Sequence, residues 1–489
     1  MLFRSGNESF EPSFTFHGFR YVEVSGYPGR PELGALEGEV VNSLPDTPSA
    51  KLETSSELVN KMWTAGLWGQ RGNFVSIPTD CPQRDERLGW MGDAGAFWRT
   101  GAYNFDIASF TRKFMDDVDD AQTPAGAFTN VAPDVLSGNE SVGAPGWGDA
   151  GVIIPYTAWR QYGDRTTIDQ NWAAMERWMS FIEGANPDHL RRKQLGPNYG
   201  DWLAPDQKTP RDLAGTAYWA LIAEMMRKMA VATGRTEAAK KYAALGDAIR
   251  TAYQTAYISA DGNVQGGTQT GYLLTLYAHL APAGMEKTIA DRLVSDINAH
   301  DVHLTTGFLG SVFLLDTLDQ QGRLDTAYKL LLNDTYPSWG YMIAKGATTW
   351  WERWNGDTGD PSMNSYNHYA FGSVMAWVYR RVAGIDVMED GAGFRHIAIA
   401  PQRSSLMTSS SAEYESVYGK ISTRWKDDGK VFSLDVTIPA NTSASVTVPG
   451  ASSAELYEGG KRVASRTGVG GRTVEVGAGS YHFESRGGQ

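Results

Sequence analysis

The sequence predicts a mainly helical protein with β-structure at both ends of the chain. From about residue 51 to 387, apolar side chains recur every three or four positions, as on one face of a helix. From 388 to 489, apolar and polar residues alternate, as in half-buried strands. Residues 1–50 are rich in Phe, Tyr and Val, which favour strands. We therefore expect three regions, 1–50, 51–387 and 388–489.

The first region is short for an independent domain. Its clearest strand-like stretch is FTFHGFRYVEVSGYPG at 14–29, which ends in a Gly-Pro-Gly turn cluster. Fifty residues are marginal for a separate hydrophobic core. We interpret this region as the last strands of a larger β-sandwich, or as an arm that packs on the helical region after it.

The middle region predicts long helices joined by long loops. Gly234 follows one apolar stripe and is suited to end that helix. The loops are rich in Gly, Pro and Trp, and loops of this length are uncommon without a function. The stripes comprise Ile168, Trp172, Met175, Met179 and Ile182; Tyr218, Ile222, Met225 and Met229; Tyr242, Leu245, Ile249 and Ala252; and Ile289, Leu293 and Ile297.

The last region predicts an antiparallel β-sandwich of short strands. In VFSLDVTIPA the apolar residues Phe432, Leu434, Val436 and Ile438 alternate with polar ones. The turn DDGK joins this stretch to KISTRWK, which alternates in the same way.

Composition narrows the classes of partner. The formal net charge of −12 argues against nucleic acid or an anionic membrane surface. No apolar run is long enough to span a membrane, and the first residues lack the apolar core of a signal peptide, so we expect a cytoplasmic location. The single cysteine, Cys81, permits no disulfide within the chain. The 16 Trp and 22 Tyr are many for 489 residues, and such rings either fill a core or stack on sugars.

Positions 80–93, DCPQRDERLGWMGD, concentrate charged residues beside aromatic ones. A carboxyl group close to Trp and to other acids should have a raised pKa, which suits a general acid at neutral pH. The structural alternative is an Arg–Asp salt-bridge network that closes a loop. The residues concerned are Asp80, Asp85, Glu86 and Asp93, with Arg84, Arg87, Trp90 and Trp98.

A second group of candidates lies in GATTWWERWNGDTGD at 346–360. Glu352 stands between Trp351 and Trp354, and burying a carboxylate there is costly without a purpose or a partner. The structural alternative is an ion pair with the adjacent Arg353. His368 follows in SYNHYAFGSV, and a lone histidine is more often structural than a ligand.

Two further loops pair an acid with an indole. Trp147 lies near Asp149 in GWGDAG, and Asp201 precedes Trp202 in NYGDWLAPD. If the helices form a closed ring, these loops would gather at one end and could form a sugar pocket with two carboxyl groups in opposed roles. No HxxxH spacing and no Asp-x-Asp-x-Asp-Gly loop is present, so we expect no metal site.

The stretches DCPQRDERLGWMGD, GATTWWERW and NHYAFGSV, in this order, resemble the bacterial α-L-rhamnosidases of glycoside hydrolase family seventy-eight. FHGFRYVEVSGYPG also resembles the β-sandwich segment that precedes the catalytic barrel in that family. The resemblance implies an (α/α)6 barrel, a C-terminal antiparallel β-sandwich, and a remnant of an N-terminal sandwich over residues 1–50. It implies an inverting hydrolase for terminal α-L-rhamnose that uses no cofactor, with a carbohydrate as partner and homo-oligomerisation left open.

The resemblance also implies roles for individual residues. Glu86 would be the general acid, with Asp85 as its adjacent rival, and Glu352 would be the general base. The alternatives are another (α/α)6 glycosidase that acts on a different sugar, and an inactive sugar-binding fragment. The substrate-binding residues would be Asp80, Arg84, Trp90, Asp93, Trp147, Trp202 and His368, and less closely Trp339 and Trp351.

Overall fold

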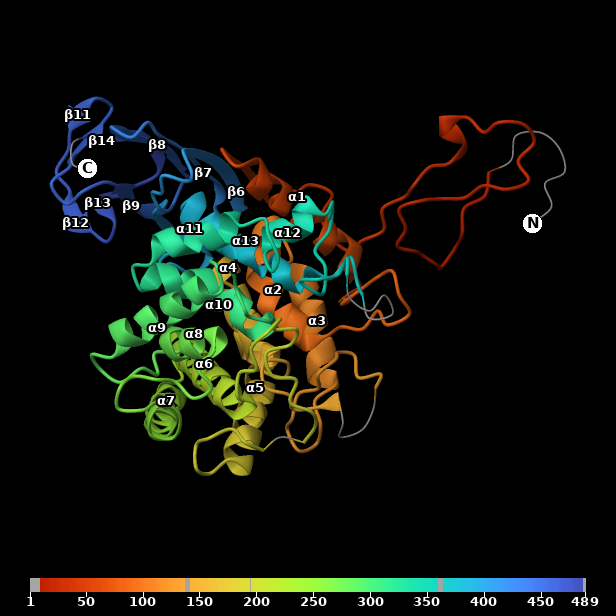
Figure 1. The fold of residues 1–489 in the computed structure, drawn as a ribbon, viewed down its shortest axis with the longest axis horizontal. Coiled ribbons are helices and arrows are strands. Elements are labelled where there is room, and N and C mark those ends of the chain that lie inside the picture. Colours follow the sequence, from red (N-terminus) through yellow and green to blue (C-terminus); the bar gives the residue numbers. More distant parts are fainter. Residues whose placement is uncertain (1–8, 137–140, 194, 359–363, 487–489) are drawn as a thin grey trace.

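The computed structural model describes residues 9–136, 141–193, 195–358 and 364–486, and its helices and strands occupy separate parts of the molecule (Figure 1). This confirms the mainly helical prediction. The helices are α1 Glu57–Asn73, α2 Met91–Asn104, α3 Ala108–Asp120, α4 Ala150–Tyr162, α5 Thr166–Ala185, α6 Arg211–Ala232, α7 Thr236–Tyr257, α8 Gln269–Tyr277, α9 Glu286–Ala299, α10 Phe308–Gln320, α11 Leu324–Leu332, α12 Trp339–Ala344 and α13 Val374–Trp377, with the short helical turns η4 Tyr369–Ser373 and η5 Val378–Val382 beside α13.

The helices form a closed ring. Helices α2, α4, α6, α8 and α10 each contact the next, α10 contacts η4, and η4 contacts α2. Helices α5, α7, α9 and α11 each pack on the outside of the inner helix that precedes them, and α1 packs on η4. Helices α4, α6, α8 and α10 thus each form a hairpin with an outer helix, as in the expected (α/α)6 barrel.

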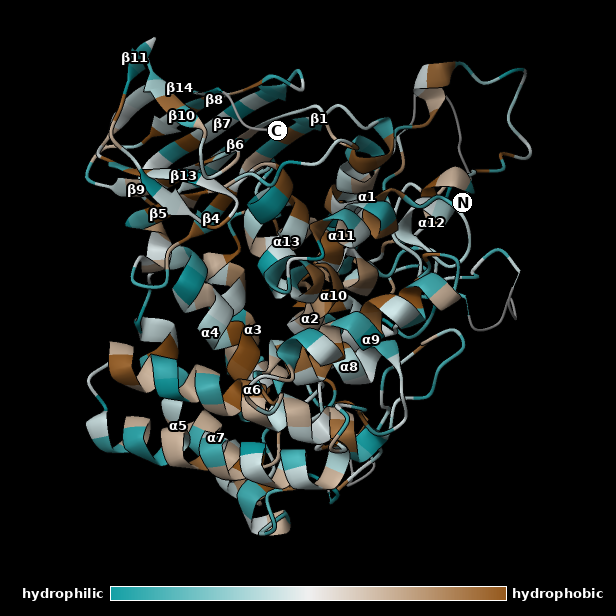
Figure 2. Cartoon of the chain, turned by 60° about the vertical axis from the view of Figure 1, so that its left-hand side comes forward, coloured by the Kyte–Doolittle hydropathy of each residue, from teal (hydrophilic) through white to brown (hydrophobic). Residues whose placement is uncertain are grey.

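The apolar stripes read from the sequence are the faces by which the helices pack. In α5, all five predicted stripe residues are buried, and Figure 2 shows hydrophobic residues concentrated between the helices, with hydrophilic ones on the outer side of α5 and α7. Gly234 has a φ of +73°, two residues after the end of α6. This confirms its predicted role, because glycine adopts that left-handed conformation without steric cost.

The C-terminal region is a sandwich of two sheets. The seven-stranded sheet has the order β1-β6-β7-β8-β14-β10-β11 and the five-stranded sheet the order β12-β13-β9-β5-β4. The pairing is antiparallel, as expected, except between β5 and β9, which are parallel. The strands are β1 Ala50–Thr54, β4 Ile385–Val387, β5 His396–Ile399, β6 Ser409–Ser416, β7 Gly419–Asp427, β8 Val431–Ile438, β9 Ser443–Pro449, β10 Glu455–Glu458, β11 Lys461–Arg462, β12 Arg466–Gly468, β13 Gly471–Val476 and β14 Gly479–Arg486, and a separate hairpin is formed by β2 Phe74–Val75 and β3 Ile77–Pro78.

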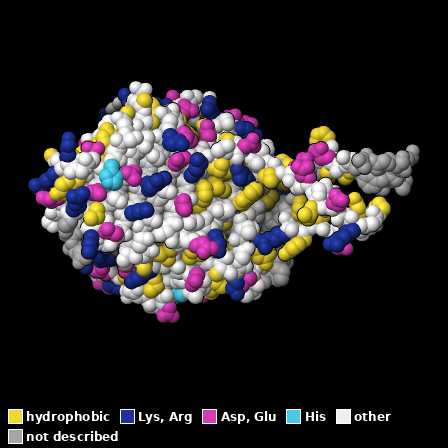
Figure 3. Space-filling view, turned by 90° about the horizontal axis from the view of Figure 1, so that it is seen from above, with side chains coloured by type: hydrophobic (Ala, Val, Ile, Leu, Met, Phe, Trp, Pro, Cys, Tyr) yellow, Lys and Arg dark blue, Asp and Glu magenta, His cyan; other side chains and the backbone are white. Residues whose placement is uncertain are grey.

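The N-terminal segment does not form the expected strands. Between residues 9 and 49 the structure contains one short helical turn, η1 Leu33–Ala35, and no strand. The segment extends away from the body as an arm, with many apolar side chains exposed (Figures 1 and 3). A strand needs partner strands to satisfy its backbone, and the described chain offers none to this segment. Only β1, which begins at Ala50, joins a sheet, and it pairs with β6.

The sandwich is attached to one end of the barrel. The Gln161 amide near the end of α4 donates to the Tyr414 hydroxyl (2.7 Å), and the Tyr103 hydroxyl near the end of α2 donates to the carbonyl of Ile385 (3.1 Å). The indole of Trp425 donates to the carbonyl of Val382 (2.8 Å). These contacts lie at the C-terminal ends of inner helices, so the sandwich leaves the N-terminal ends to the long loops.

Within the described ranges, no helix combines the length and apolar character that a membrane span requires.

Replacement of Gly372 tests the packing where the ring closes. A β-carbon there would lie 2.7 Å from the indole of Trp350 and 3.0 Å from the ring of Phe97, both fully buried. We expect Gly372→Ala to lower the free energy of unfolding by about 1–3 kcal/mol, measured by urea denaturation followed by circular dichroism. Gly184→Ala is the control, because a β-carbon at Gly184 would meet no atom within 4 Å. Equal stability of both variants would contradict this view of the closure.

Candidate active site

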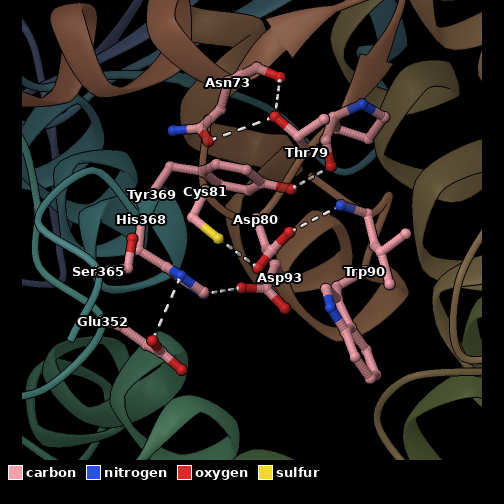
Figure 4. Close-up of polar contacts among 12 residues, drawn as sticks. Asn73, Thr79, Asp80, Cys81, Trp90, Asp93, Glu352, Ser365, His368 and Tyr369 are labelled. Carbon is pink, nitrogen blue, oxygen red and sulfur yellow. Dashed lines mark hydrogen bonds and ion pairs between the residues drawn. The ribbon is translucent and has the colours of Figure 1, made fainter. Parts of the chain in front are cut away.

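The loops that precede the inner helices gather at one end of the barrel. The loop at 79–90 leads into α2, and the loop at 345–368 leads into η4. Because α2 and η4 are neighbours in the ring, these two loops meet although they are far apart in sequence. Figure 4 shows the side chains that they bring together, with Glu352 and His368 on one side and Asp80, Asp93 and Trp90 on the other.

The first loop is folded back on itself by Asp80. Its backbone N–H donates to the Leu88 carbonyl, and its carboxylate accepts the Leu88 N–H, both at 2.9 Å. Gly89 is required beside it, because a β-carbon there would lie 2.1 Å from the carbonyl oxygen of Ala132. Within this loop Asp85 is exposed, whereas the Glu86 carboxylate accepts hydrogen bonds from the Trp90 indole (2.8 Å) and from Arg84 Nε (3.0 Å). Of the two adjacent acids, Glu86 is the one that faces the site.

The second loop holds Glu352 in a buried position. Its side chain is 7% exposed, and its backbone N–H donates to the carbonyl of Ser365 (2.9 Å). Its closest cations are Arg84, with Nη2 at 3.4 Å, and His368, with Nδ1 at 3.9 Å. Among the described ion pairs none joins Glu352 to Arg353, so the proposed pairing with the adjacent arginine was wrong.

Arg84 links the two loops electrostatically. Its Nη2 lies 2.5 Å from Glu86 Oε2 and 3.4 Å from Glu352 Oε2. The two carboxylate oxygens are therefore no farther apart than the sum of these distances. The guanidinium thus lies within ion-pair distance of both carboxylates.

His368 is held between two carboxylates. Its Nε2 is 2.5 Å from Asp93, in the first turn of α2, and its backbone N–H donates to the Trp350 carbonyl (2.8 Å). Burial alone would lower the pKa of His368, but the charge and hydrogen bond of Asp93, together with the charges of Glu352 and Asp80, outweigh it and raise the pKa to about 9. The imidazolium thus donates to Asp93 and directs its other nitrogen towards Glu352 (Figure 4).

The expectation of a raised pKa was wrong for Glu86 and fits Asp80 instead. Burial tends to raise the pKa of Glu86, but the Trp90 indole N–H and the Arg84 guanidinium stabilise the carboxylate and leave the pKa lowered. The nearby indole therefore acts as a donor, not as an apolar wall. The pKa of Asp80 is raised to about 7 because its side chain is buried.

Asp80, Cys81 and Glu86 form a group whose potential ligand atoms lie within 4.8 Å of one another. Burial raises the pKa of the Cys81 thiol well above its usual range, and Cys81 Sγ donates to the Asp80 carboxylate (2.9 Å). A metal would bind the thiolate instead. The observed contacts are those of a protonated thiol.

Three of the predicted tryptophans surround one tyrosine that the sequence did not single out. The centre of the Tyr199 ring lies 5.8 Å from the ring centre of Trp90, 4.7 Å from that of Trp147 and 6.0 Å from that of Trp202. Gly92 admits Trp147, because a β-carbon at Gly92 would lie 2.4 Å from its indole. Tyr199 belongs to the NYGDW loop, so its aromatic setting was visible in the sequence. Together these rings form an aromatic wall beside Glu86.

The other two predicted tryptophans lie deeper. Trp339 is fully buried, and its indole donates to the carbonyl of Phe371 (3.0 Å). With no exposed surface it cannot stack on a sugar in this conformation, and it packs edge-on against Trp354 instead. Trp351 is 6% exposed and packs edge-on against Tyr366.

The acids of the two remaining loops face away from the site. The Asp149 carboxylate pairs with the buried guanidinium of Arg191 (2.8 Å) and accepts from the Trp178 indole (3.2 Å). Asp201 accepts from the backbone N–H groups of Gly307 (2.8 Å) and Gly310 (3.0 Å), at the start of α10. Each of these two acids satisfies buried donors of the scaffold.

Comparison with known families identifies all three regions. The bacterial alpha-L-rhamnosidase 6 hairpin glycosidase domain matches residues 48–382, and the C-terminal domain of the same proteins matches 384–462. The concanavalin-like domain of bacterial alpha-L-rhamnosidases matches 2–42, of which the described residues, 9–42, lie in the arm.

Relatives agree with these matches. An alpha-L-rhamnosidase from Streptomyces avermitilis is 45% identical over 98% of this chain and 46% of its own length, and one from Formosa agariphila is 37% identical over 91% and 49%. The chain thus spans about half the length of the curated relatives it matches. The solved structure of the Streptomyces avermitilis enzyme complexed with L-rhamnose superposes with a TM-score of 0.92 at 44% identity, covering 98% of this chain and 46% of that one. The structure of the Dictyoglumus thermophilum alpha-L-rhamnosidase also superposes with a TM-score of 0.92. It is 33% identical, and the match covers 98% of this chain and 55% of that one.

The charge on His368 predicts a pH-dependent contribution to stability. Its pKa rises on folding from 6.5 to about 9, so the ion pair with Asp93 stabilises the protein fully below pH 6.5, and this stabilisation is lost as the pH rises through about 9. We expect His368→Gln to lower the free energy of unfolding more at pH 6 than at pH 9.5. Urea titrations of both proteins at the two pH values measure this, and an equal difference at both would contradict a charged His368.

Proposed function

The chain belongs to the bacterial α-L-rhamnosidases, and from this membership we propose that it hydrolyses terminal, non-reducing α-L-rhamnose from rhamnosides such as plant glycosides or polysaccharide side chains. The observation that carries the proposal is the meeting of Glu86 and Glu352 across Arg84 beside an aromatic wall. Glycoside hydrolysis typically uses two carboxyl groups that flank the glycosidic bond, and aromatic rings beside them can stack on the sugar.

We assign opposed roles to the two carboxyl groups. Glu86 protonates the leaving oxygen, and Glu352 removes a proton from the water that attacks the other face of the sugar. The Trp90 indole and Arg84 together hold the pKa of Glu86 low, so the acid role requires that both contacts open when the substrate enters. Without these two donors, burial raises the pKa of Glu86, and its carboxyl group can hold a proton.

The proposed base is positioned by a chain of two contacts, from Asp93 to His368 and from His368 to Glu352. Asp93 fixes His368, and the imidazolium faces Glu352 at 3.9 Å. In the proposed role the Glu352 carboxylate accepts a proton from the attacking water, and His368 orients it. The whole Glu352 residue is 5% exposed. Its Oε2 has no hydrogen-bond partner among the described residues, which leaves this oxygen available to a water molecule.

The remaining residues shape the sugar pocket in this proposal. Asp80, Arg84 and Asp93 supply polar contacts to the rhamnose ring, and the rings of Trp90, Trp147 and Trp202 stack on it and receive its methyl group. Trp351 borders the base, His368 orients it, and Trp339 packs against Trp354 of the base loop. The reaction uses water and no cofactor.

We further propose the division into residues 1–50, 51–387 and 388–489. The family matches at 2–42, 48–382 and 384–462 support boundaries close to these.

Conversion of either carboxylate to an amide tests the two roles. We expect Glu86→Gln and Glu352→Gln each to lower kcat on an aryl α-L-rhamnoside on the order of 10²–10⁴-fold, because proton transfer is lost. Asp85→Asn is the matched control, since Asp85 is adjacent to Glu86 and exposed. Unchanged melting temperatures would show that the fold is retained. A rate near that of the parent protein in either Gln variant would refute the corresponding role.

Product analysis tests the stereochemical proposal. An inverting enzyme releases β-L-rhamnose first from an α-L-rhamnoside, and proton NMR during the first turnovers detects that anomer before mutarotation. Initial release of the α anomer would overturn inversion. Cleavage of an aryl glucoside in place of the rhamnoside would support the alternative barrel glycosidase, and rhamnose binding without turnover would support a sugar-binding fragment.

A further inference from the structure

The N-terminal arm touches the barrel at both loops that carry the two carboxylates. The contacts come from the stretch FHGFR at residues 16–20. Phe16 is half-buried, whereas the other residues of this stretch are exposed. The contact is therefore local, and it lies where the loops at 80–90 and 345–368 meet.

Arg20 binds the loop of the proposed base. Its Nη2 donates to Thr348 Oγ1 (2.9 Å) and to the Gly346 carbonyl (3.2 Å). Gly346 has a φ of +87°, so the chain turns sharply at this point. Arg20 is therefore hydrogen-bonded to the turn at Gly346, and this turn precedes Glu352 in the same loop.

Phe16 binds the loop of the proposed acid. The Arg87 guanidinium lies 4.9 Å from the centre of its ring, at a distance typical of a cation–π contact, and Arg87 Nη2 donates to the Phe16 carbonyl (3.5 Å). Arg87 Nε also donates to the Pro82 carbonyl inside the same loop (3.0 Å). Phe16 therefore supports an arginine that braces the loop and directly follows Glu86.

Gly18 lies between these two contacts and packs on Gln83. A β-carbon at Gly18 would lie 2.7 Å from the β-carbon of Gln83, so the backbone approaches as closely as glycine permits. Gln83 in turn donates to the Ser365 hydroxyl (2.9 Å), and the Ser365 carbonyl accepts the N–H of Glu352 (2.9 Å). The acid loop and the base loop are thereby connected beneath the arm.

We propose that residues 16–20 act as a clamp that holds the Glu86 loop and the Glu352 loop in their mutual position, with Arg20 and Phe16 as positioning residues. The proposal rests on the proposed function for its effect on turnover. Each contact is partly exposed and contributes little stability by itself. Its effect on rate is larger, because small displacements of catalytic groups lower the rate steeply.

The test compares Arg20→Ala, Arg20→Lys and Phe16→Leu with Arg30→Ala in the whole chain. Arg30 lies on the same arm, is exposed, and has no hydrogen bond, ion pair or ring contact among the described residues, so it matches Arg20 in charge only. Two properties are measured: hydrogen exchange of the peptides covering 81–88 and 345–354, and kcat and KM on an aryl α-L-rhamnoside.

We expect Arg20→Ala to speed exchange in 345–354 and to lower kcat about tenfold with little change in KM, because geometry and not ground-state binding is lost. Arg20→Lys should recover part of the rate, since it keeps one donor. Phe16→Leu should speed exchange mainly in 81–88, and Arg30→Ala should change neither property.

Unchanged exchange and kcat in Arg20→Ala would overturn the clamp, as would equal effects of Arg20→Ala and Arg30→Ala. If the parent chain shows no turnover, the proposed function fails. The exchange comparison alone then decides whether the arm holds the two loops.

Discussion

The closure of the helical ring between α2 and η4 is the constraint on which the site depends. The Thr100 hydroxyl in α2 donates to the carbonyl of Ser373 (3.0 Å) at the end of η4 and accepts the N–H of Ala376 (3.0 Å) in α13, so a side chain of α2 is hydrogen-bonded to the backbone of its neighbours. Since each element begins where a long loop ends, their contact fixes the distance between the two loops. Without that closure, nothing would bring the loops that carry Glu86 and Glu352 into contact.

The charges of the site form one coupled group. Asp80, Glu86, Asp93 and Glu352 supply four carboxyl groups, and Arg84 and His368 are the cations placed among them. Burying charges of one sign together is costly, and pairing offsets that cost only while all partners remain. This balance explains why Asp80 tends to keep its proton whereas Glu86 does not: Glu86 has donors from Trp90 and Arg84, and Asp80 is the more deeply buried. A neutral substrate that displaces Arg84 would redistribute the protons of this group.

The arm gives the site a second support, from outside the barrel. Most of its side chains face solvent, yet Phe16 and Arg20 touch the body at the two loops that carry Glu86 and Glu352. Long loops are the parts of a fold that packing constrains least. A contact that spans two of them therefore limits their relative motion more than a contact within the helical core would.

The sequence by itself determined the fold class and singled out the two loops that meet at one end of the barrel, because periodicity and composition can be read from the residues alone. Only the tertiary structure decided which acids face the pocket. Asp149 and Asp201 share the acid-plus-indole composition of the Glu86 loop, but each is turned inward by buried donors that come from distant segments. Likewise Trp90 is a hydrogen-bond donor to Glu86, and Arg84, not Arg353, pairs with Glu352. The strand-like composition of residues 14–29 produced no strand, because a strand forms only where another strand supplies its hydrogen bonds.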